Sequence, residues 1–274
     1  MKSIKRQLVY MLLAALGIIM LFPFFWMISC AFRRPNELLT SPPKLLPASP
    51  TAESFIYVLT QTEIPRYFLN SVIIAVLATV LCICVAIPAA YSFARHRYRG
   101  KNMVMIGILL CNMIPQASTL VPLYRAMDSL HLIDTYAGIA FTHLLCMLPF
   151  SIIMLKGFIS TIPVTLEEAA MIDGCTRLKA IWKIIVPVCS SGIFATAMYA
   201  CMISWEEFLY AMTFSTSSSA RTISIGLKLF STEFKVDWAS ILAASTLMTL
   251  PILLLFFIIQ DTFIKGATGG ALKE

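Results

Sequence analysis

The segment YFLNSVIIAVLATVLCICVAIPAAYSFA, residues 67–94, decides the fold, because it contains no charged residue. A helix rises about 1.5 Å per residue, so about 20 apolar residues cross the hydrocarbon core of a bilayer. The segment exceeds that length, and it lies directly between Arg66 and Arg95. It therefore predicts a membrane-spanning helix with a charged residue at each end.

The rest of the 274-residue chain has the same character. Hydrophobic residues make up 59% of it and charged residues 13%, against about 25% charged in an average soluble domain, and the mean hydropathy is +0.83. Predicted spans cover approximately residues 8–32, 67–94, 102–124, 135–155, 184–210 and 238–262. Prolines within several of them indicate kinked helices. The sequence predicts an all-α polytopic membrane protein with about six transmembrane helices in a single domain, residues 1–274.

The N-terminal segment has a basic start and an apolar run, as a signal peptide does. The run is too long for one, however, and it ends at Arg33, Arg34 and Pro35 without a small-residue cleavage site. We expect it to be a retained first span.

Lys and Arg between the spans predict the orientation of the chain. One set of segments, which includes both termini, holds 13 of the 21 Lys and Arg residues, and the opposite set holds the other 8. The richer set is expected to be cytoplasmic. This places both termini and the loop 158–183 inside, and residues 212–237 outside. The net charge of +7 is then mainly an insertion signal, and nucleic-acid binding is disfavoured.

The most polar internal stretch is TLEEAAMIDGCTRLKAIWKIIVPV, residues 165–188. Thr165 and Glu168 have the spacing of a capping box, which predicts a short helix that begins at Leu166. Gly174 can supply the left-handed conformation that ends it. Ala169 and Ala170 are small enough for a partner to approach closely. The alternative is an ordinary capped helix at the surface.

Glu168-Ala169-Ala170, then Gly174, then Ile184 and Val186-Pro187 have a characteristic spacing. The pattern resembles the EAA loop of the permease subunits of bacterial ABC importers and departs from it only at Val186, where Leu is usual. The resemblance implies that this loop is a cytoplasmic coupling helix that docks on the ATPase. The residues implied in that coupling are Glu167, Glu168, Ala169, Ala170, Asp173 and Gly174.

The resemblance extends over nearly the whole chain and is closest to the carbohydrate-uptake branch of the family. It rests on Asn70-Ser71, Ala90 to Ala94, Pro122 to Tyr124, Trp205 and Phe208 to Tyr210. The C-terminal tail, residues 263–274, resembles that of the second permease subunit of maltose-type importers, with Gly269 and Leu272 as variations. This implies an ATPase-contacting tail with Lys265, Gly266, Thr268, Gly270 and Lys273. The alternative is a frayed, glycine-rich end.

A protein of this kind is expected in the bacterial inner membrane with several partners. The resemblance implies a second permease subunit, two cytoplasmic ATPase subunits or domains and an extracytoplasmic solute-binding protein, besides membrane lipid. The chain lacks the G-x-x-x-x-G-K-[ST] loop that cradles phosphates. We therefore expect no cofactor in this chain, with ATP and Mg on the partner ATPase, and no enzyme activity of its own.

Other candidate chemistry is weaker. The eight Cys residues are expected to be small packing residues, since none form C-x-x-C, and His143 to be packed or hydrogen-bonded. No catalytic or metal-ligating set is predicted. Trp205, Glu206 and Glu207 are possible substrate or gate residues, of which at most one carboxylate is expected to face a pore. Their alternative is an interfacial Trp beside solvated carboxylates.

The sequence thus predicts a permease subunit that forms half of a pore for sugar uptake. One alternative is the same machinery with a non-sugar solute, such as a phosphodiester or a polyamine. Another is a self-sufficient secondary transporter, which the scarcity of charges within the spans disfavours. An intramembrane enzyme would need a catalytic constellation in the spans, and the sequence offers none.

Overall fold

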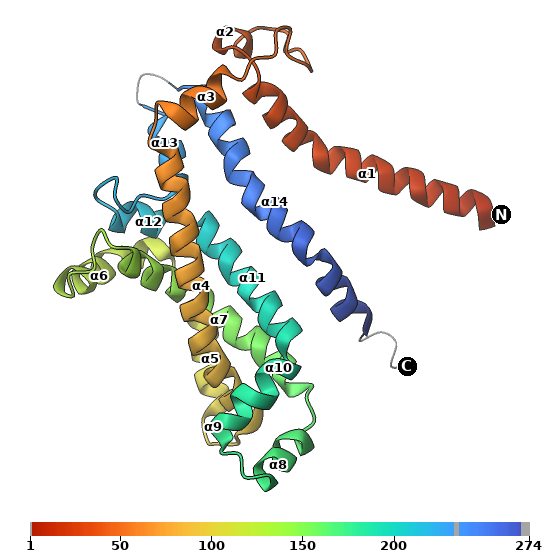
Figure 1. Cartoon of the computed structure of the whole chain (residues 1–274), viewed down its shortest axis with the longest axis vertical. Coiled ribbons are helices and arrows are strands. Elements are labelled where there is room, and N and C mark those ends of the chain that lie inside the picture. Colours follow the sequence, from red (N-terminus) through yellow and green to blue (C-terminus); the bar gives the residue numbers. More distant parts are fainter. Residues whose placement is uncertain (1, 233–235, 270–274) are drawn as a thin grey trace. The chain divides into compact units, whose positions relative to one another are not determined.

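The computed structural model describes residues 2–232 and 236–269, with side chains for residues 6–232 and 236–257. It is built almost entirely of helices (Figure 1). In chain order these are α1 Lys2–Ala31, α2 Pro35–Leu38, α3 Glu53–Thr60, α4 Ile64–Arg95, α5 Lys101–Cys111, α6 Gln116–Ser129, α7 Tyr136–Ser160, α8 Thr165–Ile172, α9 Arg177–Ala180, the π-helix η1 Ile181–Ile185, α10 Val186–Val188, α11 Ser190–Glu206, α12 Leu209–Phe214, α13 Ile223–Leu229 and α14 Trp238–Gly269.

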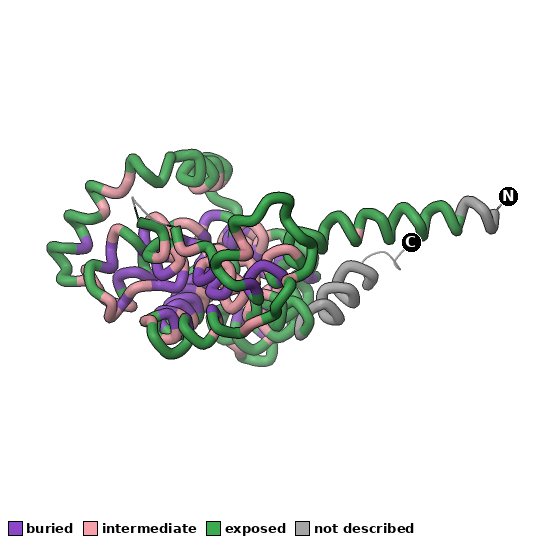
Figure 2. The backbone as a smooth tube through the Cα atoms, turned by 90° about the horizontal axis from the view of Figure 1, so that it is seen from above, coloured by how far each residue is buried: buried purple, intermediate pink, exposed green. Residues whose placement is uncertain are grey.

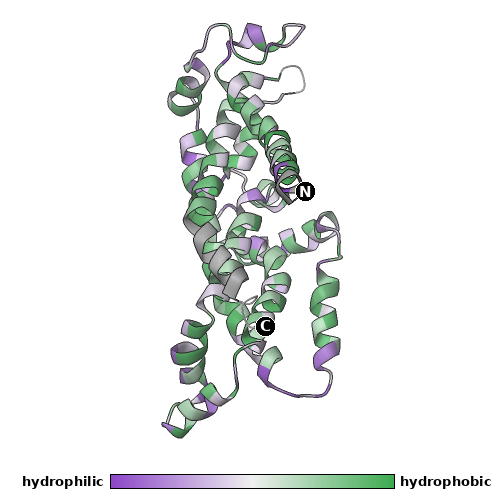
Figure 3. Cartoon of the chain, turned by 90° about the vertical axis from the view of Figure 1, so that its right-hand side faces the viewer, coloured by the Kyte–Doolittle hydropathy of each residue, from purple (hydrophilic) through white to green (hydrophobic). Residues whose placement is uncertain are grey.

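Four helices are long and apolar enough to cross a membrane by themselves, within α1, α4, α7 and α14. Two further spans arise only if bent helix pairs are counted. These are α5 with α6, bent by 97°, and Arg177–Val188 with α11, bent by 83°. The predicted all-α fold is confirmed, with four to six candidate spans. The long helices are hydrophobic along most of their length, and hydrophilic residues gather in the connections (Figure 3).

The third predicted span, residues 102–124, is wrong as a continuous helix. The chain leaves the helix after Cys111 and re-enters it at Gln116, with Pro115 at the N-cap of α6. The residue before a proline is disfavoured in the helical region, and proline itself donates no backbone hydrogen bond. Hydropathy extends through such a break because Met113 and Ile114 are apolar. The fifth span is likewise interrupted, at Cys189.

The described part of the chain divides into two compact units, one within residues 1–66 and 226–253 and the other within residues 67–225 and 254–274. In the first unit, most described apolar residues of α1 are exposed, and the tube of α1 is coloured as exposed over most of its length in Figure 2. At the end of α1, Arg33 is buried and lies over the Trp26 ring, 4.8 Å from its centroid. It also donates to Ser29 Oγ at 3.2 Å. These contacts fix the start of the following connection.

Helix α7 lies at the centre of the second unit. About half of its residues are buried by other helices of the protein. Ala78, Cys82, Ala86 and Ala90 form a fully buried stripe of small residues along α4. Small side chains at this spacing let helices approach closely in a membrane protein. A close approach is also required at Gly192 of α11, where a Cβ would lie 2.4 Å from the Phe158 ring of α7. The core of this unit therefore holds α4, α7 and α11 together.

Candidate functional site

Helix α8 begins differently from the prediction. Val164 occupies the N-cap in a helical conformation, and no side chain hydrogen-bonds to the first turn. The predicted capping box is therefore wrong, because Thr165 is already inside the helix, where its hydroxyl cannot cap. The helix starts instead through the backbone, since Glu167 N and Glu168 N donate to Val164 O at 2.9 and 3.1 Å.

Helix α8 ends as predicted, at a left-handed glycine. Gly174 has a φ of +86°. Cys175 N donates to Ala170 O at 3.0 Å, and Gly174 N donates to Met171 O at 3.1 Å. These are the two bonds of a Schellman motif. A Cβ at position 174 would meet no atom within 4 Å, so the requirement for glycine comes from the backbone alone.

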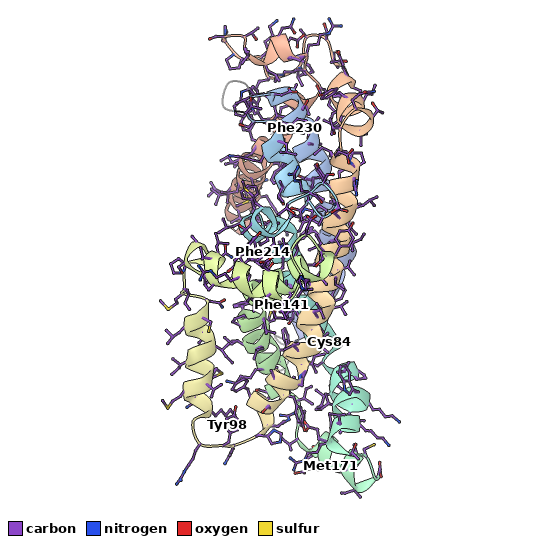
Figure 4. The ribbon with its side chains drawn as sticks, turned by 90° about the vertical axis from the view of Figure 1, so that its left-hand side faces the viewer. Cys84, Tyr98, Phe141, Met171, Phe214 and Phe230 are labelled. Carbon is purple, nitrogen blue, oxygen red and sulfur yellow. The ribbon has the colours of Figure 1, made fainter. Side chains whose placement is uncertain are left out.

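One face of α8 and its flanking residues is exposed. Of the residues singled out from the sequence, Glu168, Ala169, Asp173 and Gly174 are exposed. Exposed apolar side chains accompany them, namely Val164, Leu166, Met171 and Ile172, the last 86% exposed. We call Val164, Leu166, Glu168, Ala169 and Met171 to Gly174 the α8 surface. Figure 4 shows Met171 at the same end of the second unit as Tyr98 in the α4–α5 connection. An apolar surface edged by carboxylates, outside the long helices, is typical of a protein interface.

The opposite face of α8 is buried and carries Glu167 and Ala170. Both oxygens of Glu167 are engaged by side chains at the end of α4. Arg95 Nε lies 2.5 Å from Oε1, and Tyr91 Oη donates to Oε2 at 2.8 Å. Arg95 Nη2 also donates to Ile162 O, just before α8, at 2.8 Å. Glu167 is thus held inside the second unit rather than on the α8 surface.

Sequence reasoning did not connect Tyr91 and Arg95 with Glu167. The available signal was their spacing of four residues at the end of a span, which places both on one face of a helix. A second contact lies nearby, since Arg177 Nη1 of α9 lies 3.1 Å from Nε2 of His96, the residue that follows α4. The start of α9 is capped by Thr176, whose Oγ1 accepts from Lys179 N.

Trp205, Glu206 and Glu207 lie at the end of α11 with different environments. Glu206 is exposed, whereas Trp205 and Glu207 are only 4% and 8% exposed. Trp205 packs edge-on against Phe68, with ring centroids 5.6 Å apart. The alternative of an interfacial Trp beside solvated carboxylates does not describe this arrangement, because Trp205 and Glu207 are both buried. The two neighbouring carboxylates do point to different surroundings, as their helical spacing implies.

Glu207 has a structural role in the break between α11 and α12. Its oxygens accept from Tyr210 N and Ala211 N at 2.8 and 2.9 Å, so the side chain satisfies two backbone donors in the first turn of α12. His143 Nε2 lies 3.1 Å from Glu207 Oε2, although the ring N–H is not aligned as a hydrogen bond. His143 is fully buried, and its Nδ1 lies 2.8 Å from Ser204 Oγ, so the prediction of a packed or hydrogen-bonded His143 is confirmed.

A cavity of about 580 Å³ lies in the second unit beside the break between α5 and α6. It is lined by Cys111, Asn112, Ile114, Gln116, Thr119, Pro122, Leu123, Ala126, Leu145, Cys146, Leu148, Pro149 and Tyr210. Its polar groups include Asn112, Gln116 and a Thr119–Tyr210 hydroxyl pair at 2.7 Å. Irregular backbone at membrane depth is tolerated where it lines a cavity, and this set of amide and hydroxyl groups suits a polar, uncharged solute. The sequence did not indicate this cavity, because a hydropathy profile does not detect the bend.

The connection after α12 is held by Asp134. Oδ1 of Asp134 accepts from Thr216 N and Ser217 N, both at 3.0 Å, and Oδ2 accepts from the hydroxyls of Ser217 and Ser219. Burial opposes ionisation of Asp134, but these four bonds outweigh it and hold its pKa below the ordinary value. Residues 217–220, which include Ser217 and Ser219, form the bend and turn that these bonds hold.

The backbone at Lys265, Gly266 and Thr268 is helical, because α14 continues to Gly269. The predicted tail therefore does not separate from the final span at residue 263. Gly270 and Lys273 lie outside the described residues.

Comparison with known families identifies the family to which the chain belongs. Residues 83–269 match the family described as the binding-protein-dependent transport system inner membrane component. The chain belongs to this family. The match covers α8, both bent helix pairs, the C-terminal part of α4 and all of α14. The predicted resemblance to importer permeases is confirmed, and this chain is a permease subunit located in the inner membrane.

Curated relatives of this permease match over nearly their full length. The trehalose/maltose transport system permease protein MalG of Thermococcus litoralis is 34% identical over 273 residues, which is 98% of each chain. The sulfoquinovosyl glycerol transport system permease protein SmoH of Agrobacterium fabrum is 32% identical over 92% of this chain and 89% of that protein. The diacetylchitobiose uptake system permease protein DasC of Streptomyces coelicolor is 30% identical over 93% and 92%.

A solved structure supports the fold of the permease. A chain of a bacterial ABC transporter that imports the acidic polysaccharide alginate superimposes with a TM-score of 0.80, at 19% identity, over 94% of this chain and 96% of that one. A second alginate transporter structure, in complex with a periplasmic protein bound to an alginate pentasaccharide, superimposes with a TM-score of 0.66. At this identity the likeness concerns the fold.

Proposed function

We propose that this permease forms half of a sugar pore in a binding-protein-dependent ABC importer and couples to a separate ATPase through the α8 surface. The observation that carries the coupling assignment is the exposure of Met171, Ile172 and Glu168 around the left-handed Gly174. A helix of eight residues exposes this much apolar surface stably only when a partner covers it. The contact residues are Glu168, Ala169, Asp173 and Gly174, with Glu167 acting from behind.

The substrate class rests on the relatives. The three permeases described above are named for a sulfoquinovosyl glycerol, for trehalose and maltose, and for diacetylchitobiose, and all of these are carbohydrates. The polar groups of the α5–α6 cavity favour the same class, because amides and hydroxyls donate to and accept from sugar hydroxyls without a net charge. A polyamine would require carboxylates, and the cavity lining contains none among the described residues.

The remaining partners follow from the same assignment. The second permease subunit completes the pore, ATP and Mg are bound by two ATPase subunits in the cytoplasm, and the solute-binding protein meets the segment 212–237 outside. Lys265, Gly266, Thr268, Gly270 and Lys273 contact the ATPase dimer. Trp205 and Glu207 stabilise the break between α11 and α12 from inside the second unit. Glu206, which is exposed, is the residue of the three that can face the pore. Both termini are cytoplasmic.

Reconstitution of the complete complex tests this function. The permease, the second permease and the ATPase encoded beside it would be purified together and placed in liposomes with the solute-binding protein. We expect hydrolysis of ATP to be stimulated by the binding protein loaded with an oligosaccharide, and not by glycerophosphodiesters or polyamines. Stimulation by one of the latter would replace sugar as the substrate class. Absence of any ATPase in the purified complex would refute the coupling assignment.

A further inference from the structure

A buried ion pair links α8 to the end of α4. Arg95 and Glu167 form an ion pair whose side chains are only 10% and 5% exposed. A carboxylate buried to this degree needs its oxygens satisfied, and here a guanidinium takes one oxygen while a tyrosine hydroxyl takes the other. All three side chains come from the same two helices, so the cluster joins α8 to α4 specifically.

We propose that the Tyr91–Arg95–Glu167 cluster is a mechanical link, by which movement of α8 on the ATPase is passed to α4 and so to the pore. The proposal rests on the function proposed above. Arg95 and Glu167 are positioning residues in it, because they touch neither solute nor nucleotide. Their role is to pass the displacement of a short surface helix directly to α4, so that it is not taken up by the connections at the ends of α8.

The geometry supports transmission rather than simple attachment. Glu167 and Ala170 lie one turn apart on the buried face of α8, while Ile172 lies on the exposed surface. A displacement that the ATPase imposes on the α8 surface therefore also moves Glu167 and Ala170 on the buried face. Because Arg95 also bonds Ile162 O, the connection before α8 is held by the same guanidinium and cannot absorb the movement alone.

Helix α4 is suited to carry the movement onward. The whole helix is 32 residues long, with the cluster at its C-terminal end. Its Ala86 and Ala90 are packed in one apolar cluster with Leu155 and Ile159 of α7. Close-packed interfaces move as bodies rather than deform. A displacement at Arg95 therefore reaches α7, which lines the α5–α6 cavity through Cys146 and Pro149.

The test separates docking from transmission in the reconstituted complex. Glu167→Gln keeps the shape of the side chain and removes its charge, and Arg95→Lys keeps the charge but cannot bond Glu167 and Ile162 O through one planar group. We expect both complexes to retain the ATPase at wild-type stoichiometry. We expect sugar taken up per ATP hydrolysed to fall by about 5-fold or more for Glu167→Gln, and by less for Arg95→Lys. The matched control is Arg97→Ala, an exposed arginine two residues on, which should leave the ratio unchanged.

A double variant covers the case in which a single change prevents folding. Arg95→Met with Glu167→Leu replaces the buried pair by apolar side chains, which often preserves or raises stability, while removing the directional bonds. We expect a folded complex with retained ATPase and a low transport ratio. A wild-type ratio in the double variant or in Glu167→Gln would overturn the proposal. Loss of the ATPase from those complexes would also overturn it, since these residues would then serve docking. An unmodified complex without ATPase would instead refute the proposed function.

Discussion

Replacement of Gly174 by Val is the sharpest test of the α8 surface. No atom lies within 4 Å of a Cβ built at this position, so the substitution creates no clash. The cost comes from the φ of +86°, which is unfavourable for a side-chain-bearing residue by roughly 1–3 kcal/mol and worst for a β-branched one. The chain can avoid this strain only by unwinding the end of α8.

Unwinding has a cost that the structure also sets. It breaks the bonds from Cys175 N to Ala170 O and from Gly174 N to Met171 O, each worth about 1 kcal/mol net. Keeping the strained backbone and unwinding the end of α8 thus have similar costs, of about 2 kcal/mol. This is too small to unfold the membrane helices, but it shifts Ile172 and Asp173 on the α8 surface. We expect normal membrane levels of Gly174→Val, with weakened co-purification of the ATPase and reduced uptake.

Two control variants make the result interpretable. Gly174→Asn should lie between the wild type and Gly174→Val, because Asn adopts the left-handed conformation more readily than other residues with a side chain. Gly157→Val adds the same side chain in α7, where a Cβ also meets nothing within 4 Å and no positive φ is needed. Wild-type uptake and ATPase retention in Gly174→Val, or equal loss in all three variants, would refute the backbone argument.

Other predictions concern the loops and the termini. Because hydrogen bonds lower the pKa of Asp134, its ionised form stabilises the fold above the unfolded pKa of about 4, and this contribution is lost as pH falls through the folded value. Asp134→Asn should therefore increase proteolysis at residues 216–219 at pH 7, and the difference from wild type should shrink towards pH 3; a constant difference would contradict the role of the charge. A reporter active only in the periplasm should be active when fused within residues 35–63 and silent after Lys101, and the reverse would invert the orientation. Deletion of residues 266–274 should leave membrane insertion intact while co-purification of the ATPase drops. Full transport by the truncated chain would refute the proposed contact between the tail and the ATPase.

Several features of this protein follow from the sequence alone, because each depends on local chemistry. Charge-free runs such as residues 67–94 have no stable place outside a bilayer, and so the long helices α1, α4, α7 and α14 are predictable. The left-handed end of α8 is predictable from Gly174, since few other residues adopt that conformation without strain. The family is predictable from the spacing of Glu168, Gly174 and Pro187, and residues 83–269 do match a family of importer membrane components.

The rest depends on tertiary contacts between distant parts of the chain. The predicted capping box was a local pattern. In the structure the helix begins one residue earlier, because Val164 O accepts from the backbone of the first turn, and Thr165 therefore does not cap it. The break before Pro115 is invisible to hydropathy, because apolar residues continue through it while the direction of the helix changes. The partner of Glu167 is 72 residues away at Arg95. Only the packing of α4 against the loop between α7 and α9 decides that this carboxylate points inward, while its neighbour Glu168 remains on the surface.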